Sequence, residues 1–217
     1  MKLIRLTVGP MDNNCYIIRS DKGNGFIIDP GAESEKILEA IRANEVTLKA
    51  ILLTHGHFDH IGAVRDLIEA TGAGIIVSKE DEEMLYDPVK NVGARFADDL
   101  RYNLSGLRVE RTVSHGDRLE LDELTLTVFA TPGHTLGSVV YILGDMLFTG
   151  DTLFAGTIGI VTHYGGDLQT EVASVKRLAD ELEGDYRVLP GHDRETTLET
   201  ERRTNPYLGN VDYDDCY

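Results

Sequence analysis

Cysteine is scarce in this sequence of 217 residues, and its two cysteines, Cys15 and Cys216, stand at opposite ends without a CxxC spacing. This scarcity excludes a disulfide framework and a zinc site of closely spaced thiolates, and it suits a reducing compartment. Long apolar runs are also absent. Arg5 and Pro10 interrupt the N-terminus, and no later stretch approaches the roughly 18 to 20 apolar residues of a membrane span. We therefore expect a cytoplasmic chain without a membrane partner or an export signal.

Basic residues are outnumbered, because 21 Lys and Arg face 37 Asp and Glu, which gives a formal net charge of −16. Binding to a phosphate backbone depends on clustered Lys and Arg, so we expect no nucleic-acid partner. We interpret the acidic surplus as a solvated, self-repelling surface. The hydrophobic fraction of 41% is ordinary, and the length suffices for one sizeable α/β domain or two very small ones. No repeat or linker divides the chain.

Short apolar runs alternate with segments of helical period, which is typical of an α/β protein. Residues 87–104 show no clear pattern. We predict strands over 15–20, 25–31, 48–54, 74–78, 124–131, 138–143, 146–150 and 186–191. We predict helices over 33–44, 63–72 and 168–184, the last with an Asp167 cap.

Three of the seven histidines fall within the stretch THGHFDHIG, residues 54–62, which directly follows a predicted buried strand. In an extended segment, side chains two positions apart face the same side, so His55 and His57 can hold one ion. Asp59 and His60 lie where the chain turns into the following helix, and they can reach a neighbouring ion. A surface loop that is rich in histidine by chance is the alternative.

The kinds of donor in this stretch indicate the kind of site. Gly56 has no Cβ, which lets the backbone pass closely around a cation. Imidazole and carboxylate ligands without thiolate suit zinc, iron or manganese. Several open coordination positions point to a catalytic site rather than a closed structural one.

Three further candidates each follow a predicted strand: His134 in TPGHTLGS, Asp151 in TGDTLF and His192 in LPGHD. Alone, a histidine in a PGH turn or an aspartate after a strand is more often a turn, cap or surface residue. Loops at strand ends, however, are where α/β folds gather site residues. Four such segments in one chain therefore favour a shared site.

The segments THGHFDH, PGHT, GDTLF and PGH, in this order, resemble the metallo-β-lactamase superfamily. The resemblance covers nearly the whole chain, from GPMDNNCYII and IIDPG to PGHDRETTLETERRTNPYL. It is closest to short hydrolases related to glyoxalase II, the hydroxyacylglutathione hydrolases. A secreted lactam-hydrolysing enzyme fits less well, because no export signal is present and a histidine follows the aspartate of HxHxDH.

This resemblance implies an α/β fold, a four-layer αββα sandwich of two mixed sheets with helices outside and metals at one edge between the sheets. It implies a single domain over residues 1–217, without a separate C-terminal substrate-binding domain. It also implies two divalent metal ions, zinc first, with iron or manganese as alternatives. The implied ligands are His55, His57 and His134 for the first ion, Asp59, His60 and His192 for the second, and Asp151 bridging both.

Two other positions match the family pattern. Asp29 in IIDPG corresponds to a supporting carboxylate, which we expect to orient a ligand histidine. His115 in SHGD falls in a commonly similar segment, and we expect a structural role there rather than ligation.

The implied chemistry is hydrolysis. Two cations about 3.5 Å apart share a water and lower its pKa, so that a bridging hydroxide attacks a carbonyl polarised by the same ions. Asp59 is the catalytic candidate, because it can orient this nucleophile or accept its proton. A thiolate leaves readily, so we predict a thioesterase of the hydroxyacylglutathione hydrolase type. Lactonase and phosphodiesterase chemistry stay open.

The sequence departs from glyoxalase II relatives after GDTLF, where they carry a basic residue that binds the glutathione carboxylate. Here Ile160 stands at about that place, and an apolar side chain cannot pair with a carboxylate. His163 or Tyr164 either substitutes for the missing cation or lines the pocket. We therefore expect a small-molecule substrate in a more open pocket, and a thioester smaller than or different from that of glutathione.

Two alternatives to the hydrolase stay open. A mononuclear iron persulfide dioxygenase resembles the same family and shares HxHxDH, but holds one iron through two histidines and an aspartate. A non-catalytic binding domain on this fold is the third possibility, and lost ligands would mark it. All seven implied ligands are present. The sequence leaves the oligomeric state open.

Overall fold

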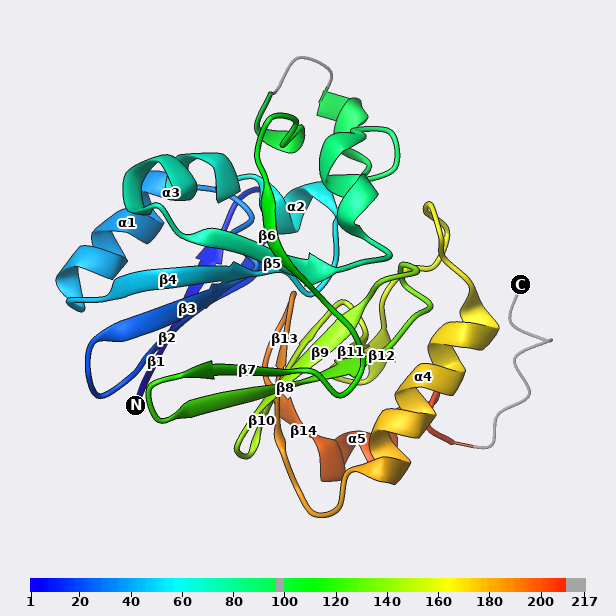
Figure 1. Cartoon of the computed structure of the whole chain (residues 1–217). Helices are drawn as coiled ribbons and strands as arrows, with labels where there is room; N and C mark the ends of the chain where they lie inside the picture. The colour runs from blue at the N-terminus through cyan, green and yellow to red at the C-terminus, as the bar shows by residue number, and fades with distance from the viewer. Residues whose placement is uncertain (97–99, 210–217) are drawn as a thin grey trace.

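Two six-stranded sheets face each other, and helices cover their outer faces (Figure 1). The computed structural model describes residues 1–96 and 100–209. In the first sheet, β1, β2 and β3 are antiparallel neighbours, and β3 to β6 run parallel. Its strands, in spatial order, are β1 (Lys2–Val8), β2 (Asn13–Arg19), β3 (Asn24–Ile28), β4 (Thr47–Leu52), β5 (Gly74–Ser78) and β6 (Val109–Val113).

The second sheet is also mixed. Strands β7 to β10 form an antiparallel meander, β13 pairs parallel with β10, and β14 pairs antiparallel with β13. A short hairpin of β11 (Leu153–Phe154) and β12 (Thr157–Ile158) lies beside it. The strands of this sheet are β7 (Arg118–Leu121), β8 (Leu124–Ala130), β9 (Val139–Leu143), β10 (Met146–Gly150), β13 (Arg187–Pro190) and β14 (Thr196–Thr197).

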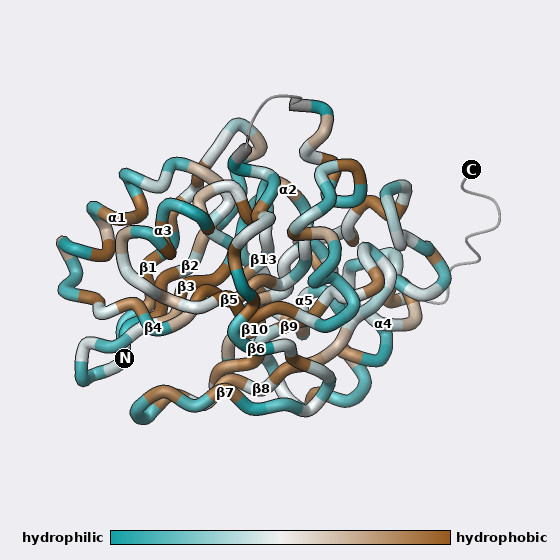
Figure 2. The backbone as a smooth tube through the Cα atoms, turned by 45° about the horizontal axis from the view of Figure 1, so that its top comes forward, coloured by the Kyte–Doolittle hydropathy of each residue, from teal (hydrophilic) through white to brown (hydrophobic). Residues whose placement is uncertain are grey.

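Alternation along the strands produces the layers. Successive residues of a strand point to opposite faces, so each central strand buries one set of side chains against helices and the other against the opposing sheet. The core between the sheets includes Tyr16, Ile18, Phe26, Ile28, Leu52, Leu126, Val128, Tyr141 and Phe148. The core under the helices of the first sheet includes Ile17, Ile27, Ile51, Ile37, Ile41 and Leu67. Figure 2 shows the hydrophobic stretches concentrated along these strands. The predicted αββα sandwich is confirmed.

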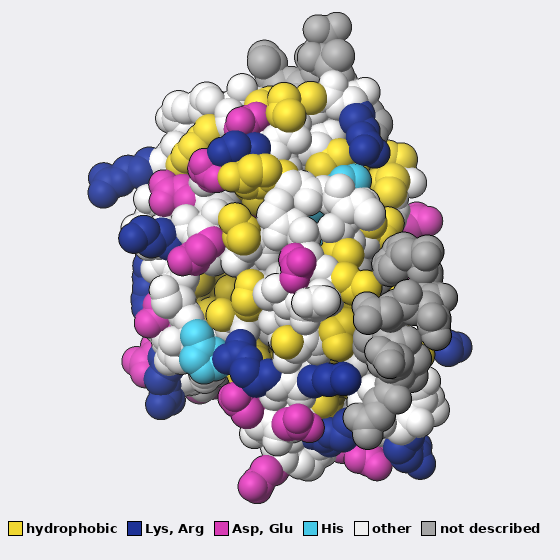
Figure 3. Space-filling view, turned by 90° about the vertical axis from the view of Figure 1, so that its right-hand side faces the viewer, with side chains coloured by type: hydrophobic (Ala, Val, Ile, Leu, Met, Phe, Trp, Pro, Cys, Tyr) yellow, Lys and Arg dark blue, Asp and Glu magenta, His cyan; other side chains and the backbone are white. Residues whose placement is uncertain are grey.

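Helices α1 (Ser34–Ala43) and α3 (Val64–Thr71) cover the first sheet, and α4 (Leu168–Glu181) and α5 (Leu198–Thr204) cover the second (Figure 1). The predicted cap of α4 is present, since the Asp167 carboxylate accepts the Thr170 N–H at 2.8 Å. On the face that α4 covers, Figure 3 shows cationic and anionic side chains interspersed. None of the described helices is long and apolar enough to cross a membrane.

Residues 87–104, which the sequence pattern left open, contain the 3₁₀ turns η2 (Gly93–Phe96) and η3 (Leu100–Tyr102), and η1 (Glu82–Tyr86) precedes them. Cys15 is fully buried, and burial raises the pKa of its thiol. Cys216 lies outside the described residues, so its lack of a disulfide partner stays a prediction.

The strand directions place six strand ends at one edge of the molecule. Strands β3, β4 and β5 are parallel, so their C-terminal ends coincide. Strand β8 has the same direction as β10 and β13, because antiparallel β9 separates β8 from β10 and β13 is parallel to β10. The segments that follow five of these strands, β3, β4, β8, β10 and β13, carry Asp29 and the predicted ligands.

Candidate metal centre

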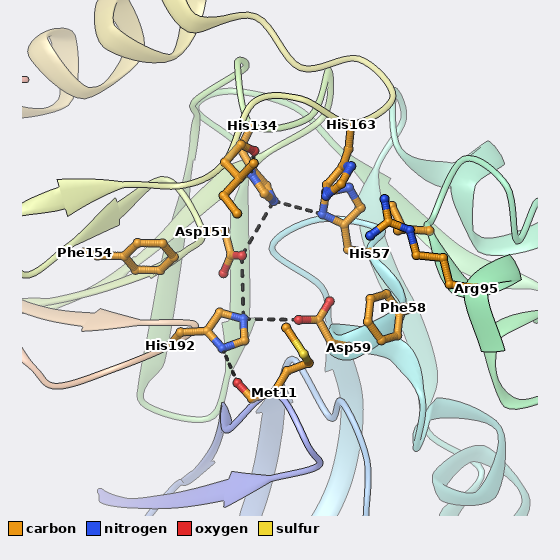
Figure 4. Close-up of a pocket in the computed structure, with 12 residues that line it drawn as sticks. Met11, His57, Phe58, Asp59, Arg95, His134, Asp151, Phe154, His163 and His192 are labelled. Carbon is orange, nitrogen blue, oxygen red and sulfur yellow. Dashed lines mark hydrogen bonds and ion pairs between the residues drawn. The ribbon is translucent and has the colours of Figure 1, made fainter. Parts of the chain in front are cut away.

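The structure brings all seven predicted ligand side chains together at this edge. Figure 4 shows five of them: His57, Asp59, His134, Asp151 and His192. Helix α2 (Phe58–Ile61), directly after the β4 loop, supplies two of them. Among the described residues, the donor atoms form three groups within 4.8 Å: His55 with His57 and His134, His55 with His60 and Asp151, and Asp59 with His60 and His192. The Asp151 carboxylate lies between the outer groups, with one oxygen 3.3 Å from His60 Nε2 and the other 3.7 Å from His134 Nε2 and His192 Nε2.

Hydrogen bonds fix which ring nitrogens carry lone pairs in the first group. His134 Nδ1 lies 2.7 Å from the Ile160 carbonyl, which can only accept, so Nδ1 carries the proton. The Thr54 hydroxyl donates to Asp29, so it must accept from His55 Nδ1 at 3.1 Å. The Nε2 atoms of His55 and His134 therefore both present lone pairs, 3.2 Å apart.

Two facing lone pairs repel each other unless a cation lies between them. Nitrogen ligands about 2.0 to 2.1 Å from a tetrahedral ion are about 3.3 Å apart, which fits this spacing. His57 Nδ1 completes the group at 2.9 Å from His134 Nε2, and His57 Nε2 is buried without a hydrogen-bond partner. The donor set and its spacing thus fit a metal ion.

The second group combines carboxylate and imidazole. Asp59 Oδ2 lies 3.2 Å from His192 Nε2 and 3.9 Å from His60 Nε2. His192 Nδ1 donates to the Met11 carbonyl at 2.8 Å, which aims Nε2 at the two carboxylates (Figure 4). This set of two imidazoles and up to two carboxylates suits zinc, manganese or iron.

The two groups differ in electrostatics. Burial, together with the neighbouring imidazoles, lowers the pKa of His55 well below its ordinary value and that of His57 to about 3. Both rings are therefore neutral at physiological pH, as metal ligation requires. At His60, burial acts in the same direction, but Asp151, Asp29 and Asp59 outweigh it and raise the pKa. Without metal, a proton provides the positive charge that this group of carboxylates favours.

The carboxylate of Asp29 contacts residues that belong to or hold both donor groups. Its carboxylate accepts the Thr54 N–H at 2.8 Å and the Thr54 hydroxyl at 2.6 Å, and Thr54 in turn fixes the tautomer of His55. The same carboxylate lies 3.0 Å from His60 Nδ1, which directs His60 Nε2 towards Asp151. The orienting role expected for Asp29 stays a prediction, and this contact is the geometry it requires.

Glycines provide the close approach of the loops. A Cβ at Gly191 would lie 2.4 Å from Asp151 Oδ1 and 2.8 Å from His60 Cε1, so only glycine fits beside the centre. The structure adds a reason for glycine at position 56. A Cβ there would meet Met84 Cβ at 2.8 Å, so the packing of η1 requires a small residue, and the close approach of the backbone to a cation stays a prediction.

Sequence patterns missed two buried carboxylates that hold the ligand loops. Asp81, after β5, accepts the N–H groups of Gly56 and Gly137 at 2.9 and 2.8 Å and the Thr135 hydroxyl at 2.7 Å. It thereby joins the THGH and PGHT loops. Glu171 of α4 accepts the His134 N–H at 2.7 Å. Burial raises the pKa of Asp81 to about 6 and that of Glu171 to about 9.

A cavity of about 430 Å³ opens onto the centre. Of the three pocket residues expected from sequence, Ile160 and His163 line it. Tyr164 does not belong to its lining, since its hydroxyl donates to Glu83 at 2.7 Å and its ring lies under Lys90. The remaining lining comprises Met11, His57, Phe58, Asp59, Val92, Arg95, His134, Asp151, Phe154 and His192.

His115 stays apart from the centre. It is exposed, its Nδ1 accepts the Ala130 N–H at 3.3 Å, and its ring meets the Phe129 ring edge-on. His115 is in none of the three donor groups, and its structural role stays a prediction.

Two mixed sheets between helices, with a His and Asp cluster at one edge that can bind metal ions, define a metallo-β-lactamase fold. The chain belongs to the metallo-β-lactamase superfamily, whose profile matches residues 8–192. It is 34% identical over 211 residues to hydroxyacylglutathione hydrolase GloC of Haemophilus influenzae, with 96% of this chain and 98% of that protein covered.

Solved structures extend the likeness. BLEG-1 B3 metallo-beta-lactamase matches with a TM-score of 0.87 and 31% identity over 95% of this chain and 99% of that one. TTHA1623, solved in a di-iron-bound form, matches with a TM-score of 0.82 and 35% identity over 94% and 100%. Together these similarities support a metal-dependent hydrolase in general.

Proposed function

We propose that this protein is a hydrolase of thioesters that acts at a two-metal centre held by the seven clustered side chains. One observation carries the proposal: the Asp151 carboxylate lies between two groups of imidazole and carboxylate donors, and the same cavity reaches both. The similarity to a hydroxyacylglutathione hydrolase supports the thioester as the substrate class.

Two divalent ions bound there would lower the pKa of a water and polarise the substrate carbonyl. The protein supplies the rest. Asp59 lines the cavity, so its carboxylate can orient the attacking water or take up its proton. The C–S bond then breaks, and the thiolate departs without a general acid because its conjugate acid is far stronger than an alcohol. Phe154 and Met11 provide apolar walls beside the reacting carbonyl.

The test is a substrate panel with the protein loaded separately with zinc, manganese and iron. We expect hydrolysis of acyl thioesters of glutathione and of N-acetylcysteamine, and the assay measures the thiol that the hydrolysis releases. Asp59→Asn lowers kcat by about 100-fold or more, as for loss of a general base, while its metal content is measured in parallel. His115→Ala, which alters an exposed histidine outside the cavity, is the matched control and retains activity.

Other outcomes identify other functions. Hydrolysis of a β-lactam without thioester turnover would refute the proposal and place this protein functionally with BLEG-1. Oxygen uptake with a persulfide by protein holding a single iron would identify the dioxygenase. Tight binding of metal without turnover of any of these substrates would indicate a binding domain.

A further inference from the structure

One wall of the cavity carries a cation that the hydrolytic centre does not use. Apart from the centre itself, the lining is apolar except for Arg95 and His163. Arg95 is the sole Lys or Arg among the lining residues that the structure describes. Figure 4 shows it next to His57, on the side of the cluster opposite Phe154.

Among the residues that the structure describes, none pairs with the guanidinium of Arg95. Within residues 1–96 and 100–209, the guanidinium forms neither an ion pair nor a hydrogen bond. The side chain is exposed, and the chain has 37 acidic residues with which it could pair. Other arginines find carboxylates: Arg187 lies 2.9 Å from Glu195, and Arg111 lies 4.0 Å from Asp117. A guanidinium that lines the cavity without a partner among the described residues is available to a ligand.

The backbone that carries Arg95 is tied to the centre. The buried Asn91 side chain donates to the carbonyls of Met84 and Tyr102 at 2.9 and 2.8 Å and accepts the Gly93 N–H at 2.8 Å. Its own carbonyl accepts the Phe58 N–H of α2 at 2.9 Å. The start of η2 is therefore fixed to the helix that bears Asp59 and His60, which sets the position of the Arg95 backbone relative to the reacting groups.

We propose that Arg95 binds an anionic group of the substrate, a carboxylate or a phosphate, and so selects acidic thioesters. This inference rests on the thioesterase function proposed above and adds its specificity-determining residue. A guanidinium offers parallel N–H donors that match either anion. The cation is held in η2, before β6, whereas the loop after GDTLF presents the apolar Ile160, which is 65% exposed. The substrate therefore places its anion near Arg95 and an apolar portion near Ile160.

Matched thioester pairs test this proposal. N-acetylcysteine and N-acetylcysteamine thioesters of one acyl group differ by a carboxylate, and those of 4′-phosphopantetheine and pantetheine differ by a phosphate. We expect wild type to favour the anionic member in kcat/KM by about twofold to fivefold, the range for an exposed charged pair. The pair with the larger ratio identifies the anion. Added salt reduces the ratio, because it screens exposed charges.

Arg95→Gln brings the ratio close to one, and Arg95→Lys keeps part of it, since an ammonium retains the charge but not the paired donors. The ratio is measured on one preparation, so partial misfolding of a variant does not affect it. Arg118→Gln, which removes an exposed cation of β7 outside the cavity, is the charge-matched control and keeps the wild-type ratio.

Binding of unreactive thioethers separates this proposal from the proposed function. Calorimetry compares S-methyl derivatives of N-acetylcysteine and N-acetylcysteamine with wild type and Arg95→Gln. If no thioester is hydrolysed but the acidic thioether still binds more tightly in an Arg95-dependent way, thioesterase activity fails and anion binding stands. If both members of each pair are hydrolysed equally well by wild type and Arg95→Gln, the role of Arg95 is overturned while the hydrolase stands.

Discussion

Replacement of Gly191 by alanine perturbs the centre at a defined point. The added Cβ would lie 2.4 Å from Asp151 Oδ1 and 2.8 Å from His60 Cε1. The backbone cannot retreat without loss, because Gly191 N donates to the Gly150 carbonyl at 2.8 Å and the Gly191 carbonyl accepts the Asn14 N–H at 2.7 Å. The side chain of Asp151 must therefore turn away from its position between the two donor groups.

The cost can be estimated from these contacts. Overpacking by one methyl group in a tight site destabilises a protein by about 1 to 3 kcal/mol. Displacement of a metal-site carboxylate or its support weakens metal affinity by about 10- to 100-fold. We expect both effects in Gly191→Ala, so one ion at least is lost during dialysis against a chelator concentration that wild type withstands.

Gly184→Ala is the matched control. Gly184 has a φ of +85°, so alanine there is strained, yet a Cβ would meet no atom within 4 Å. Gly184→Ala therefore lowers the free energy of unfolding by about 1 kcal/mol and leaves the metal centre unchanged. The assay combines urea unfolding with elemental analysis after dialysis. Retention of metal by Gly191→Ala to the same chelator concentration as wild type would refute the placement of Asp151 between the donor groups.

Two further predictions follow from buried and exposed positions near the centre. Burial raises the pKa of Asp81 from its ordinary 3.8 to about 6, so the folded state binds this proton more tightly than the unfolded state does. The free energy of unfolding therefore falls as the pH rises from about 4 to 7 and the Asp81 carboxyl loses its proton. This loss of stability amounts to about 2 to 3 kcal/mol, and Asp81→Asn removes it. In urea unfolding of metal-free protein, the free energy of unfolding should therefore depend less on pH in the variant than in wild type. The same pH dependence in both proteins would contradict the burial of the Asp81 carboxyl. Ile160→Arg restores a cation after GDTLF, so we expect kcat/KM for glutathione thioesters to rise about fivefold relative to N-acetylcysteamine thioesters. An unchanged ratio would mean that residue 160 does not face the glutathione moiety.

The parts of the fold that the sequence predicts are those whose signal is local. Strand β4 ends in an unbroken apolar run, Ala50 to Leu52, because both faces of its second half are buried. The helical stripe of α4 follows a capping aspartate. Strand β6, VERTV, was missed because charged residues fill an exposed edge strand of the sheet. The η2 segment was missed because a single side chain, that of Asn91, organises it, and no periodicity reports such a contact.

The candidate site shows the same division. His and Asp residues at strand ends are recognisable because few other roles bring these residue types together so often. Asp81 lies in the charged stretch KEDEE, which looks solvated, and only the folded chain places it under two loops. No sequence pattern marked Arg95 as a site residue, because its proposed role depends on lining a cavity that distant segments form.

The measurement that tests the central claim most directly is the metal content per chain of wild type, Asp151→Ala and His192→Ala, purified without added metal or chelator under low oxygen. Because Asp151 lies between both donor groups and His192 belongs to one, we expect about two ions in wild type, loss of both in Asp151→Ala, and about one in His192→Ala. Equal metal retention by the two variants would contradict a centre in which Asp151 is shared.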